Sequence, residues 1–474
     1  MVTQSQINMN RLQITDNHEP IALDSPCDSR YWHSEIVETV ETDLQKIANV
    51  KISDLKIDDN PNLLVFPNDL NKYGDKISEG SIINLQGNQI STNNIMGFVG
   101  VNDTQLDIKS RFAQDGGRDY FLHYMLQKVF AINLFDIPHT SNQEQIFDFL
   151  LYLFPYYLKK ALAQGLFKKY RSFERNDANI RGTIDVSRHI RQNIPFRGTV
   201  AYTVRTHSYD NEITQLIRHT IEYIKTKPYG SSILNNDAET KRSVTEIISA
   251  TQTYKQQDRA KIIGENLRPV RHPYFAAYTD LQKICLQILR HETIKYGQEK
   301  DKVYGILFDG AWLWEEYLNV AIFESIDGFY FTHPHNKSDN VGKKMFQNPH
   351  KVLCQPDFFI DGYIVLDAKY KRHESIFVDK QREDRFQVLS YMHVFNALKG
   401  GLIVPSTHTG IIEQGEVTNG GTMLLYGLNV SHYVVDFKRY AELMNEEEKE
   451  LKSNFKTIQQ NQNSYAYLST PTTV

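Results

Sequence analysis

The chain has 474 residues, of which 41% are hydrophobic and 12% aromatic. This composition is typical of folded globular proteins, and the length is enough for about three domains. The formal net charge of -4 excludes a protein that recruits nucleic acid through a global positive field. Any DNA contact must therefore come from a local basic patch or be delegated to a partner.

The three cysteines, Cys27, Cys285 and Cys354, lie far apart, and no cluster of histidines accompanies them. This spacing excludes an obvious zinc site or disulfide framework and indicates a reducing compartment. The N-terminus lacks the apolar core of a signal peptide, and no apolar run is long enough to cross a bilayer. We expect a soluble cytoplasmic protein that makes no membrane contact.

Residues 1–30 are polar and aperiodic, which predicts a flexible lead-in. Residues 31–135 are strand-rich, with a hairpin predicted over 95–112 and turning at Asn102-Asp103, and with a helix at 118–130. We predict a small β-rich N-terminal module. Its pattern leaves open whether it is a docking surface, a DNA-binding surface or a structural cap.

Residues 140–298 carry amphipathic helical patterns, including one that Asp210 is predicted to cap and two near 238–256 and 276–296. They predict a mainly α-helical central region. Within it, residues 168–205 form the most basic stretch, with nine Lys and Arg residues against three Asp and Glu residues. This segment either contacts phosphates, with an affinity that falls as salt rises, or is a solvated surface with ordinary ion pairs.

The most informative stretch, 351–372, reads KVLCQPDFFIDGYIVLDAKYKR. Two short apolar runs joined at Asp361-Gly362 predict a β-hairpin. Asp367 and Lys369 are two apart on the second strand and therefore share a face. Whether Asp357 on the first strand joins that face depends on the turn between the strands.

A two-residue turn would put Asp357 and Asp367 on opposite faces of the hairpin. A three-residue loop of residues 360–362, with Gly362 in the left-handed conformation, would bring both carboxylates and Lys369 to one face. We predict this loop, or a bulge with the same effect. Two converging carboxylates suit Mg²⁺, and the adjacent lysine can orient water and stabilise charge on a phosphate.

The simple alternative for Asp367 and Lys369 is a solvated charge pair. However, both follow the apolar run 363–366, which reads as a buried strand where unpaired charge is costly. The pattern resembles the PD-(D/E)xK nuclease superfamily, with Pro356-Asp357 as its PD and Asp367-Ala368-Lys369 as its (D/E)xK.

Two helices flank this hairpin in the sequence. On the downstream helix, 382–398, Gln387 and Tyr391 resemble the Gln-x-x-x-Tyr motif of RecB-type nucleases. In those nucleases the motif flanks the active site and the DNA backbone. The alternative is that both side chains simply pack on the helix surface. On the upstream helix, 311–323, Glu315 resembles a further metal-site carboxylate of the superfamily, in preference to its neighbour Glu316. An exposed acidic pair is the alternative there.

These patterns predict an α+β multidomain protein: a β-rich N-terminal module, a mainly helical central region, and a C-terminal PD-(D/E)xK α/β nuclease domain with a mixed sheet flanked by helices. The nuclease domain is assigned to residues 300–440. Residues 441–474 are predicted to be a polar tail, helical at first and then fraying.

Several segments together resemble the McrC family, the nuclease subunit of McrBC-type modification-dependent (type IV) restriction systems. They read GLFKKY, IRGTID and DNE in the central region, and CQPDFFI, VLDAKYK and FQVLSY in the nuclease region. The resemblance implies a prokaryotic protein that works with a hexameric McrB-like AAA+ GTPase. This chain would dock on the GTPase through its N-terminal region and stimulate GTP hydrolysis by that partner. The chain has no G-x-x-x-x-G-K-[ST] motif, so GTP would be bound by the partner.

The resulting hypothesis is an endodeoxyribonuclease that cuts double-stranded, methylated foreign DNA with Mg²⁺, or Mn²⁺ as a substitute, and only with its motor partner. Asp357, Asp367 and Lys369 would be catalytic, Gln387 and Tyr391 would support them, and Glu315 would join the two aspartates at the metal. Cutting both strands would be easiest with two nuclease domains brought together. The alternatives are a non-catalytic adaptor for a AAA+ partner and an autonomous RecB-type repair nuclease.

Overall fold

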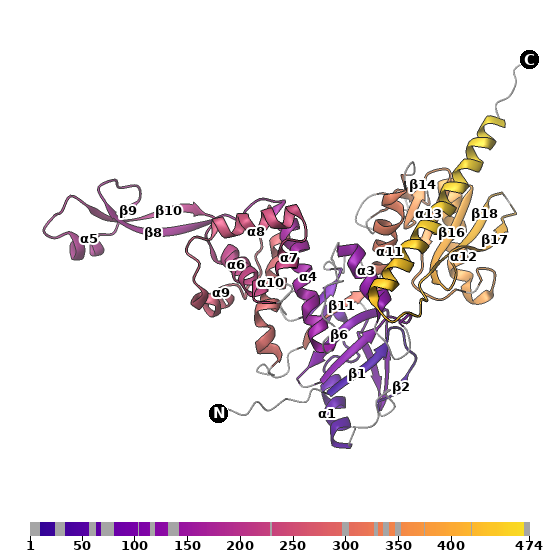
Figure 1. Cartoon of the computed structure of the whole chain (residues 1–474), viewed down its shortest axis with the longest axis horizontal. Coiled ribbons are helices and arrows are strands. Elements are labelled where there is room, and N and C mark those ends of the chain that lie inside the picture. The colour runs from indigo at the N-terminus through magenta and orange to yellow at the C-terminus, as the bar shows by residue number, and fades with distance from the viewer. Residues whose placement is uncertain are drawn as a thin grey trace, which may run out of the picture. The chain divides into compact units, whose positions relative to one another are not determined.

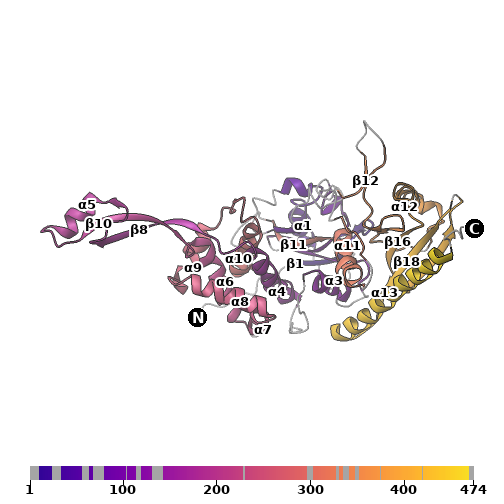
Figure 2. The same cartoon turned by 90° about the horizontal axis from the view of Figure 1, so that it is seen from above.

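The structure is a computed structural model that describes residues 10–23, 34–55, 63–67, 80–102, 104–113, 119–130, 142–227, 230–295, 303–326, 330–334, 341–346, 352–373, 375–418 and 420–468. The chain forms two compact units. One contains residues 1–135 and 297–474, and the other contains residues 136–296. Each unit is described separately (Figures 1 and 2).

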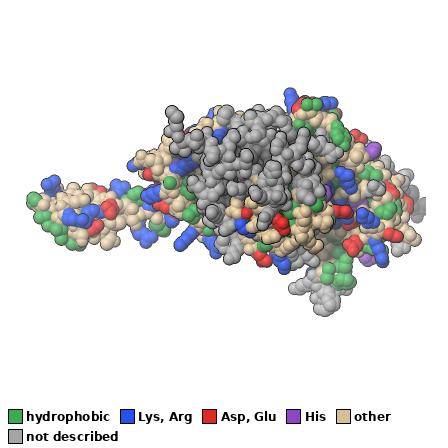
Figure 3. Space-filling model, turned by 90° about the horizontal axis from the view of Figure 1, so that it is seen from below, with side chains coloured by type: hydrophobic (Ala, Val, Ile, Leu, Met, Phe, Trp, Pro, Cys, Tyr) green, Lys and Arg blue, Asp and Glu red, His purple; other side chains and the backbone are tan. Residues whose placement is uncertain are grey.

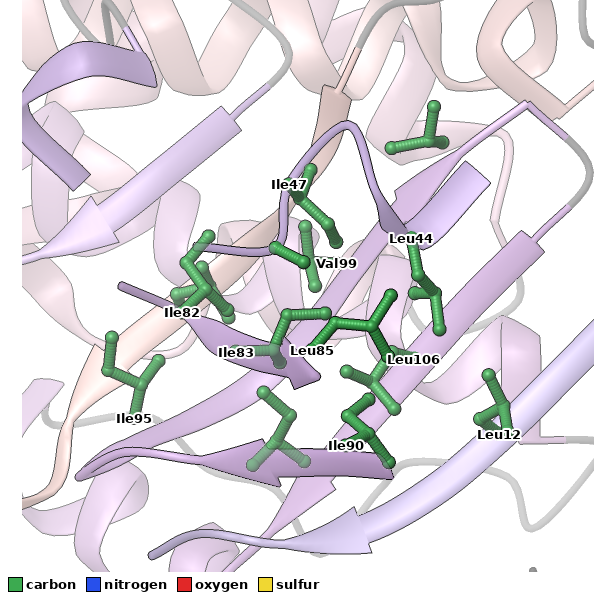
Figure 4. Packing of buried hydrophobic residues seen from close by; sticks show 14 of the residues in the cluster. Leu12, Leu44, Ile47, Ile82, Ile83, Leu85, Ile90, Ile95, Val99 and Leu106 are labelled. Carbon is green, nitrogen blue, oxygen red and sulfur yellow. The ribbon is translucent and has the colours of Figure 1, made fainter. Parts of the chain in front are cut away.

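The first unit begins with a five-stranded sheet in the order β1-β7-β6-β11-β3. Its strands are β1 (Asn10–Thr15), β3 (Leu63–Phe66), β6 (Ile95–Val101), β7 (Thr104–Lys109) and β11 (Val303–Asp309). The smaller sheet β2-β5-β4 comprises β2 (Ile21–Ala22), β5 (Gln89–Thr92) and β4 (Ile83–Gln86), and the helical segments nearby are α1 (Ser34–Leu44) and η2 (Ile52–Leu55). Buried aliphatic side chains from both sheets and from the segment after α1 form one core (Figure 4), which includes Ile47, Ile83, Leu85, Val99 and Leu106.

Two strands of this sheet differ from the sequence-based domain boundaries. Strand β1 lies in the predicted lead-in of residues 1–30, yet it pairs in parallel with β7 and buries Leu12 in the core. Strand β11, placed in the nuclease domain by sequence, pairs instead with β6 and β3. A local apolar pattern does not specify which sheet a strand joins. The predicted hairpin over 95–112 is confirmed, with Asn102 at φ +50° in its turn.

The second unit contains a set of packed helices, as predicted. They are α4 (Asn142–Leu162), α6 (Glu212–Lys225), α7 (Gly230–Leu234), α8 (Ala238–Ala250), η4 (Gln256–Asp258), α9 (Arg259–Glu265) and α10 (Ala277–Lys295). Helix α10 packs against α4 and α6. The N-cap of α6 is Asn211, one residue after the predicted Asp210, and it forms a capping box with Thr214.

The basic segment 168–205 is a β-structured arm rather than part of the helical set. The arm consists of β8 (Lys169–Asp177), β9 (Thr183–Ile184), α5 (Val186–Asn193) and β10 (Val200–Ser208), with the strand order β8-β10-β9. It extends away from the helices of its own unit (Figures 1 and 2). Strands β8 and β10 pair antiparallel, in a register that runs from Val200 opposite Asp177 to Ser208 opposite Lys169.

The C-terminal part of the first unit contains a mixed sheet in the order β14-β15-β16-β18-β17. Its strands are β14 (Phe358–Ile360), β15 (Ile364–Ala368), β16 (Lys399–Ser406), β17 (Gly410–Glu416) and β18 (Thr422–Asn429). Strands β15, β16 and β18 are mutually parallel, and β14 and β17 are antiparallel edges. The short strands β12 (Lys343–Lys344) and β13 (Leu353–Cys354) form a separate pair.

Helices cover both faces of this mixed sheet. Helix α12 (Arg382–Phe395) packs through Val388, Met392 and Phe395 against one face. The opposite face carries Phe358 and Tyr426. Phe358 contacts Phe323 on η5, and Tyr426 contacts Phe455 on α13. The helical elements around these contacts are α3 (Tyr120–Phe130), α11 (Gly310–Ala321), η5 (Phe323–Ser325), η7 (Asp379–Gln381) and α13 (Phe437–Leu468).

Helix α13 differs from the predicted polar tail of residues 441–474. Met444, Leu451 and Phe455 recur at helical spacing and are buried, so this helix is part of the packed unit. Among the residues that the structure describes, no helix is long and apolar enough to cross a membrane.

Candidate active site

The β14–β15 hairpin brings Asp357 and Asp367 to one face, as predicted. Phe358 pairs with Leu366 and Ile360 with Ile364, and the same register extended by one residue places Asp357 opposite Asp367. The loop has three residues and Gly362 adopts φ +71°, both as expected. It spans 361–363 rather than 360–362, because Ile360 remains in the strand.

Asp357 ties the two strands of the hairpin together. Its Oδ2 accepts a hydrogen bond from the backbone N–H of Ala368 at 2.6 Å. Its own carbonyl oxygen lies 2.8 Å from Nδ1 of His333. The carboxylate is thereby held beside the second strand, within a segment whose neighbours are buried.

Lys369 lies among the polar groups that the hairpin and α12 bring together. Its Nζ is 2.6 Å from Oδ2 of Asp367 and donates to Oε1 of Gln387 at 3.0 Å. Burial alone would lower the pKa of Lys369, but the negative charges of Asp367, Asp357 and Asp384 outweigh burial and raise it. The side chain is therefore a fixed cation at neutral pH.

Gln387 and Tyr391 lie one helical turn apart and reach the same site, as the spacing predicted. Nε2 of Gln387 is 2.9 Å from the Tyr391 hydroxyl and 3.4 Å from Oδ1 of Asp367. Burial raises the pKa of Tyr391, and the nearby Asp367 carboxylate adds to this effect. The phenol stays protonated at neutral pH and helps to orient the Gln387 amide between Lys369 and Asp367.

Glu315 and Glu316 lie on α11 and both face His333 rather than completing a three-carboxylate cluster. His333 Nδ1 is 3.7 Å from Oε1 of Glu315, and Nε2 is 3.9 Å from Oε1 of Glu316. The His333 ring also stacks on Phe358. No sequence motif marks this histidine, and it reaches the hairpin only through folding.

The donor set fits a magnesium ion held by few protein ligands. In the described part of the chain, no group of three or more His, Cys, Asp or Glu side chains is placed to hold one metal ion. Asp357 and Asp367 nevertheless converge on one face, and Mg²⁺ commonly binds through one or two carboxylates while keeping several waters. The predicted third ligand, Glu315, lies 3.7 Å from Nδ1 of His333, the same atom that contacts the Asp357 carbonyl oxygen.

The arm carries most of the basic segment, but not all of its cations are available to a ligand. Arg188 is buried, pairs with Glu174 at 2.6 Å and donates to the carbonyl of Tyr202 at 2.6 Å. Lys169 pairs with Glu212. These two cations stabilise the arm and its base, so the phosphate-contact prediction applies to the remaining exposed residues, which include Arg175, Arg181, Arg191 and Arg197.

One family model matches most of this chain. A family model described as "McrBC 5-methylcytosine restriction system component" matches residues 90–405, whereas no curated protein matches the chain. One similar solved structure is a half-complex of Thermococcus gammatolerans McrB AAA+ hexamers with bound McrC, with 14% identity, a TM-score of 0.49, and 95% of this chain and 100% of that chain covered. Another is a cryo-EM structure of the Thermococcus gammatolerans McrBC complex, with 14% identity and a TM-score of 0.33. The similarity covers 65% of this chain and 86% of that chain. Because the family model spans well over half of its residues, this chain belongs to the family of McrBC 5-methylcytosine restriction system components.

Proposed function

We propose that this chain is the nuclease subunit of a McrBC-like restriction system and hydrolyses phosphodiester bonds in methylated double-stranded DNA. The observation that carries the proposal is the convergence of Asp357, Asp367 and Lys369 on one face of a hairpin, with Gln387 bridging Asp367 and Lys369. Packing alone gives no reason to keep two carboxylates and a lysine together in a largely buried setting, because each charged group is costly to desolvate.

Each residue has a distinct part in the proposed reaction. Asp357 and Asp367 would hold Mg²⁺, which when bound supplies activation of water and neutralisation of phosphate charge. Lys369 orients the attacking water and stabilises the negative charge that develops on the scissile phosphate. Gln387 holds the lysine through its carbonyl oxygen, and Tyr391 holds the Gln387 amide.

The proposed partner is a McrB-like AAA+ GTPase hexamer, which would bind GTP and deliver the DNA. The arm offers a surface suited to a protein partner. Its outer part exposes apolar side chains, including Ile194 at 67% and Phe196 at 68% of their full exposure, among basic ones (Figure 3). Clustered exposed apolar side chains are typical of protein interaction sites. We therefore assign the partner contact to the arm in preference to the N-terminal β-rich module.

The test is cleavage of methylated and unmethylated plasmid by the chain with its AAA+ partner, Mg²⁺ and GTP. Asp367→Asn removes a metal-binding charge with almost no change of shape and should abolish cutting. Asp361→Asn, at the exposed loop of the same hairpin, is the matched control and should cut normally, because its surface pairing with Lys343 contributes little.

The outcomes separate the three functions. Cutting that needs partner and GTP and is lost only in Asp367→Asn supports the restriction subunit. Cutting without a partner would instead establish an autonomous nuclease of the RecB type. Stimulation of the partner's GTP hydrolysis, without cutting by either the parent chain or Asp361→Asn, would establish a non-catalytic adaptor.

A further inference from the structure

Asp384 is a buried carboxylate beside Lys369 that no sequence motif singled out. It lies in the first turn of α12, three residues before Gln387, so both side chains project from the same side of the helix. Its side chain is only 11% exposed. Oδ1 of Asp384 lies 4.0 Å from Nζ of Lys369.

The other oxygen of Asp384 is anchored by two donors from the segment that follows Lys369. Oδ2 is 2.5 Å from Nζ of Lys371 and 3.0 Å from Nε2 of His373. The His373 side chain is fully buried, and the tautomer with its hydrogen on Nε2 donates to this oxygen. Because both donors engage Oδ2, the carboxylate is held with Oδ1 directed toward Lys369.

Asp384 is ionised in this environment. Burial by itself would raise the pKa of Asp384, but the hydrogen bonds from His373 and Lys371 and the charges of Lys371 and Lys369 lower it to about 2. A fixed negative charge therefore faces the Lys369 ammonium group in a site where electrostatic interactions are weakly screened.

Lys369 interacts with two carboxylates, Asp367 and Asp384, only the first of which is a proposed metal ligand. In the structure it is in direct contact with Asp367 at 2.6 Å, whereas Asp384 is farther away. A divalent cation at Asp367 would compete with Lys369 for the same carboxylate oxygen. Asp384 and Gln387 are the groups that would then retain the ammonium group near the site.

We propose that Asp384, anchored by His373 and Lys371, is a positioning residue that holds Lys369 when Asp367 engages a divalent metal ion. This inference rests on the proposed nuclease function for its catalytic consequence. It also has a consequence that needs no catalysis, because Asp384 makes it easier for Lys369 to leave Asp367 and so favours metal binding.

The competing explanation is that Asp384 merely fastens segment 371–373 to α12. If that were its only role, Asp384→Asn would lower the stability of the chain by the same amount whichever residue occupies position 369. A positioning residue loses its effect when the lysine is absent. A double-mutant cycle between Asp384→Asn and Lys369→Met separates the two, because only residues that act on each other give non-additive effects.

The first measurement is steady-state cleavage by the full chain with its AAA+ partner. Asp384→Asn should lower kcat by about tenfold or more and leave the KM for DNA nearly unchanged, the scale typical of outer-shell residues that support a metal site. In the Lys369→Met background, the same substitution should lower the residual rate no further. Glu383→Gln, an exposed neighbour on α12, is the matched control and should behave like the parent chain.

The second measurement is Mn²⁺ binding to the chain alone, followed by the electron paramagnetic resonance signal of the free ion. Asp384→Asn should weaken Mn²⁺ binding by about tenfold or more, on the scale typical of outer-shell substitutions, and this loss should disappear in the Lys369→Met background. If Asp384→Asn does not fold, His373→Leu removes one anchor of Oδ2 and His373→Gln restores a donor. The leucine variant should then show the defect and the glutamine variant should recover.

The two proposals fail in different ways. A parent complex that does not cut DNA would overturn the nuclease function, while the Mn²⁺ titration would still decide whether Asp384 acts through Lys369. The positioning role would be overturned if Asp384→Asn lowered the cleavage rate and the Mn²⁺ affinity equally in the parent and Lys369→Met backgrounds. It would also be overturned if Asp384→Asn showed the kinetics and Mn²⁺ binding of the parent chain.

Discussion

The hydroxyl oxygen of Tyr370 lies 2.7 Å from the hydroxyl oxygen of Ser110, which joins the residue after Lys369 to the end of strand β7. Lys369 and Tyr370 directly follow strand β15, and their side chains enter different surroundings: Nζ of Lys369 contacts Asp367 and Gln387, whereas the Tyr370 side chain is buried. The lysine therefore faces the candidate site while the tyrosine is buried against the N-terminal sheet. Phe112 packs edge-on against the Tyr370 ring, and a Cβ at Gly310 would lie only 2.8 Å from it. The N-terminal sheet thus helps to fix the backbone that carries Lys369.

Tyr370→Phe should lower the free energy of unfolding of the first unit by about 1 kcal/mol, because the buried Ser110 hydroxyl loses a hydrogen-bond partner. Urea denaturation followed by tryptophan fluorescence reports on this unit, since Trp32, Trp312 and Trp314 all belong to it. Tyr433→Phe, at an exposed tyrosine of the same unit, is the control. An unchanged midpoint for Tyr370→Phe would show that the Tyr370–Ser110 contact does not stabilise the junction.

Lys128→Met should destabilise the same unit by about 2 kcal/mol or more, because it leaves a buried carboxylate without its cation. Lys128 Nζ lies 2.9 Å from Glu448, which is buried on α13 and also accepts hydrogen bonds from Tyr124 and Tyr317. Thermal unfolding should show the loss, while Lys449→Met on the exposed side of α13 should change little. Equal effects of both substitutions would mean that the Lys128–Glu448 pair does not secure α13.

Asp384 should make stability depend on pH in the acid range. In the folded chain the pKa of Asp384 is lowered to about 2 from an ordinary value of 3.8. One pKa unit corresponds to about 1.36 kcal/mol. The ionised carboxylate therefore stabilises the folded chain by about 2 kcal/mol at pH values above its unfolded-state pKa. This contribution is lost as pH falls from about 4 toward 2, because protonation then removes the charge that faces Lys371, His373 and Lys369. The measurement is the free energy of urea unfolding of the parent chain and of Asp384→Asn between about pH 3 and 7. The difference between them should be constant near neutrality and shrink below about pH 4; a difference independent of pH would contradict the lowered pKa.

Replacing Ile194 and Phe196 together by Ser should weaken binding of the AAA+ partner by at least about tenfold, since each removes an exposed apolar side chain whose burial on binding contributes about 1.5 to 3 kcal/mol. Both residues are more than half exposed, so folding of the arm should be unaffected. Isothermal titration with the partner measures the loss, and circular dichroism checks the fold. Val435→Ser, at an exposed apolar residue of the other unit, is the control. If Val435→Ser weakens binding and the double substitution of Ile194 and Phe196 does not, the partner contact lies outside the arm.

Much of the candidate site could be predicted from local sequence. The Asp-Gly pair predicted a hairpin, and the choice of a three-residue loop over a two-residue turn brought Asp357, Asp367 and Lys369 to one face. The four-residue spacing of Gln387 and Tyr391 placed both on one side of a helix. The catalytic roles of these residues and the metal remain predictions. The exact loop was shifted by one residue, because strand ends depend on pairing as well as on turn residues.

Four features of the chain were decided only by tertiary structure: the assignment of β11 to the N-terminal sheet, the pairing of β1, the anchoring of Tyr370, and the contact of Asp384 with Lys369. The sequence by itself determined the β14–β15 hairpin, the helix that carries Gln387 and Tyr391, and the helical character of the second unit, because side-chain periodicity and turn conformation act over a few residues. It did not determine which distant segments meet. That choice depends on side-chain packing and strand pairing between residues far apart in the chain, whose energies appear only when the partners are in contact.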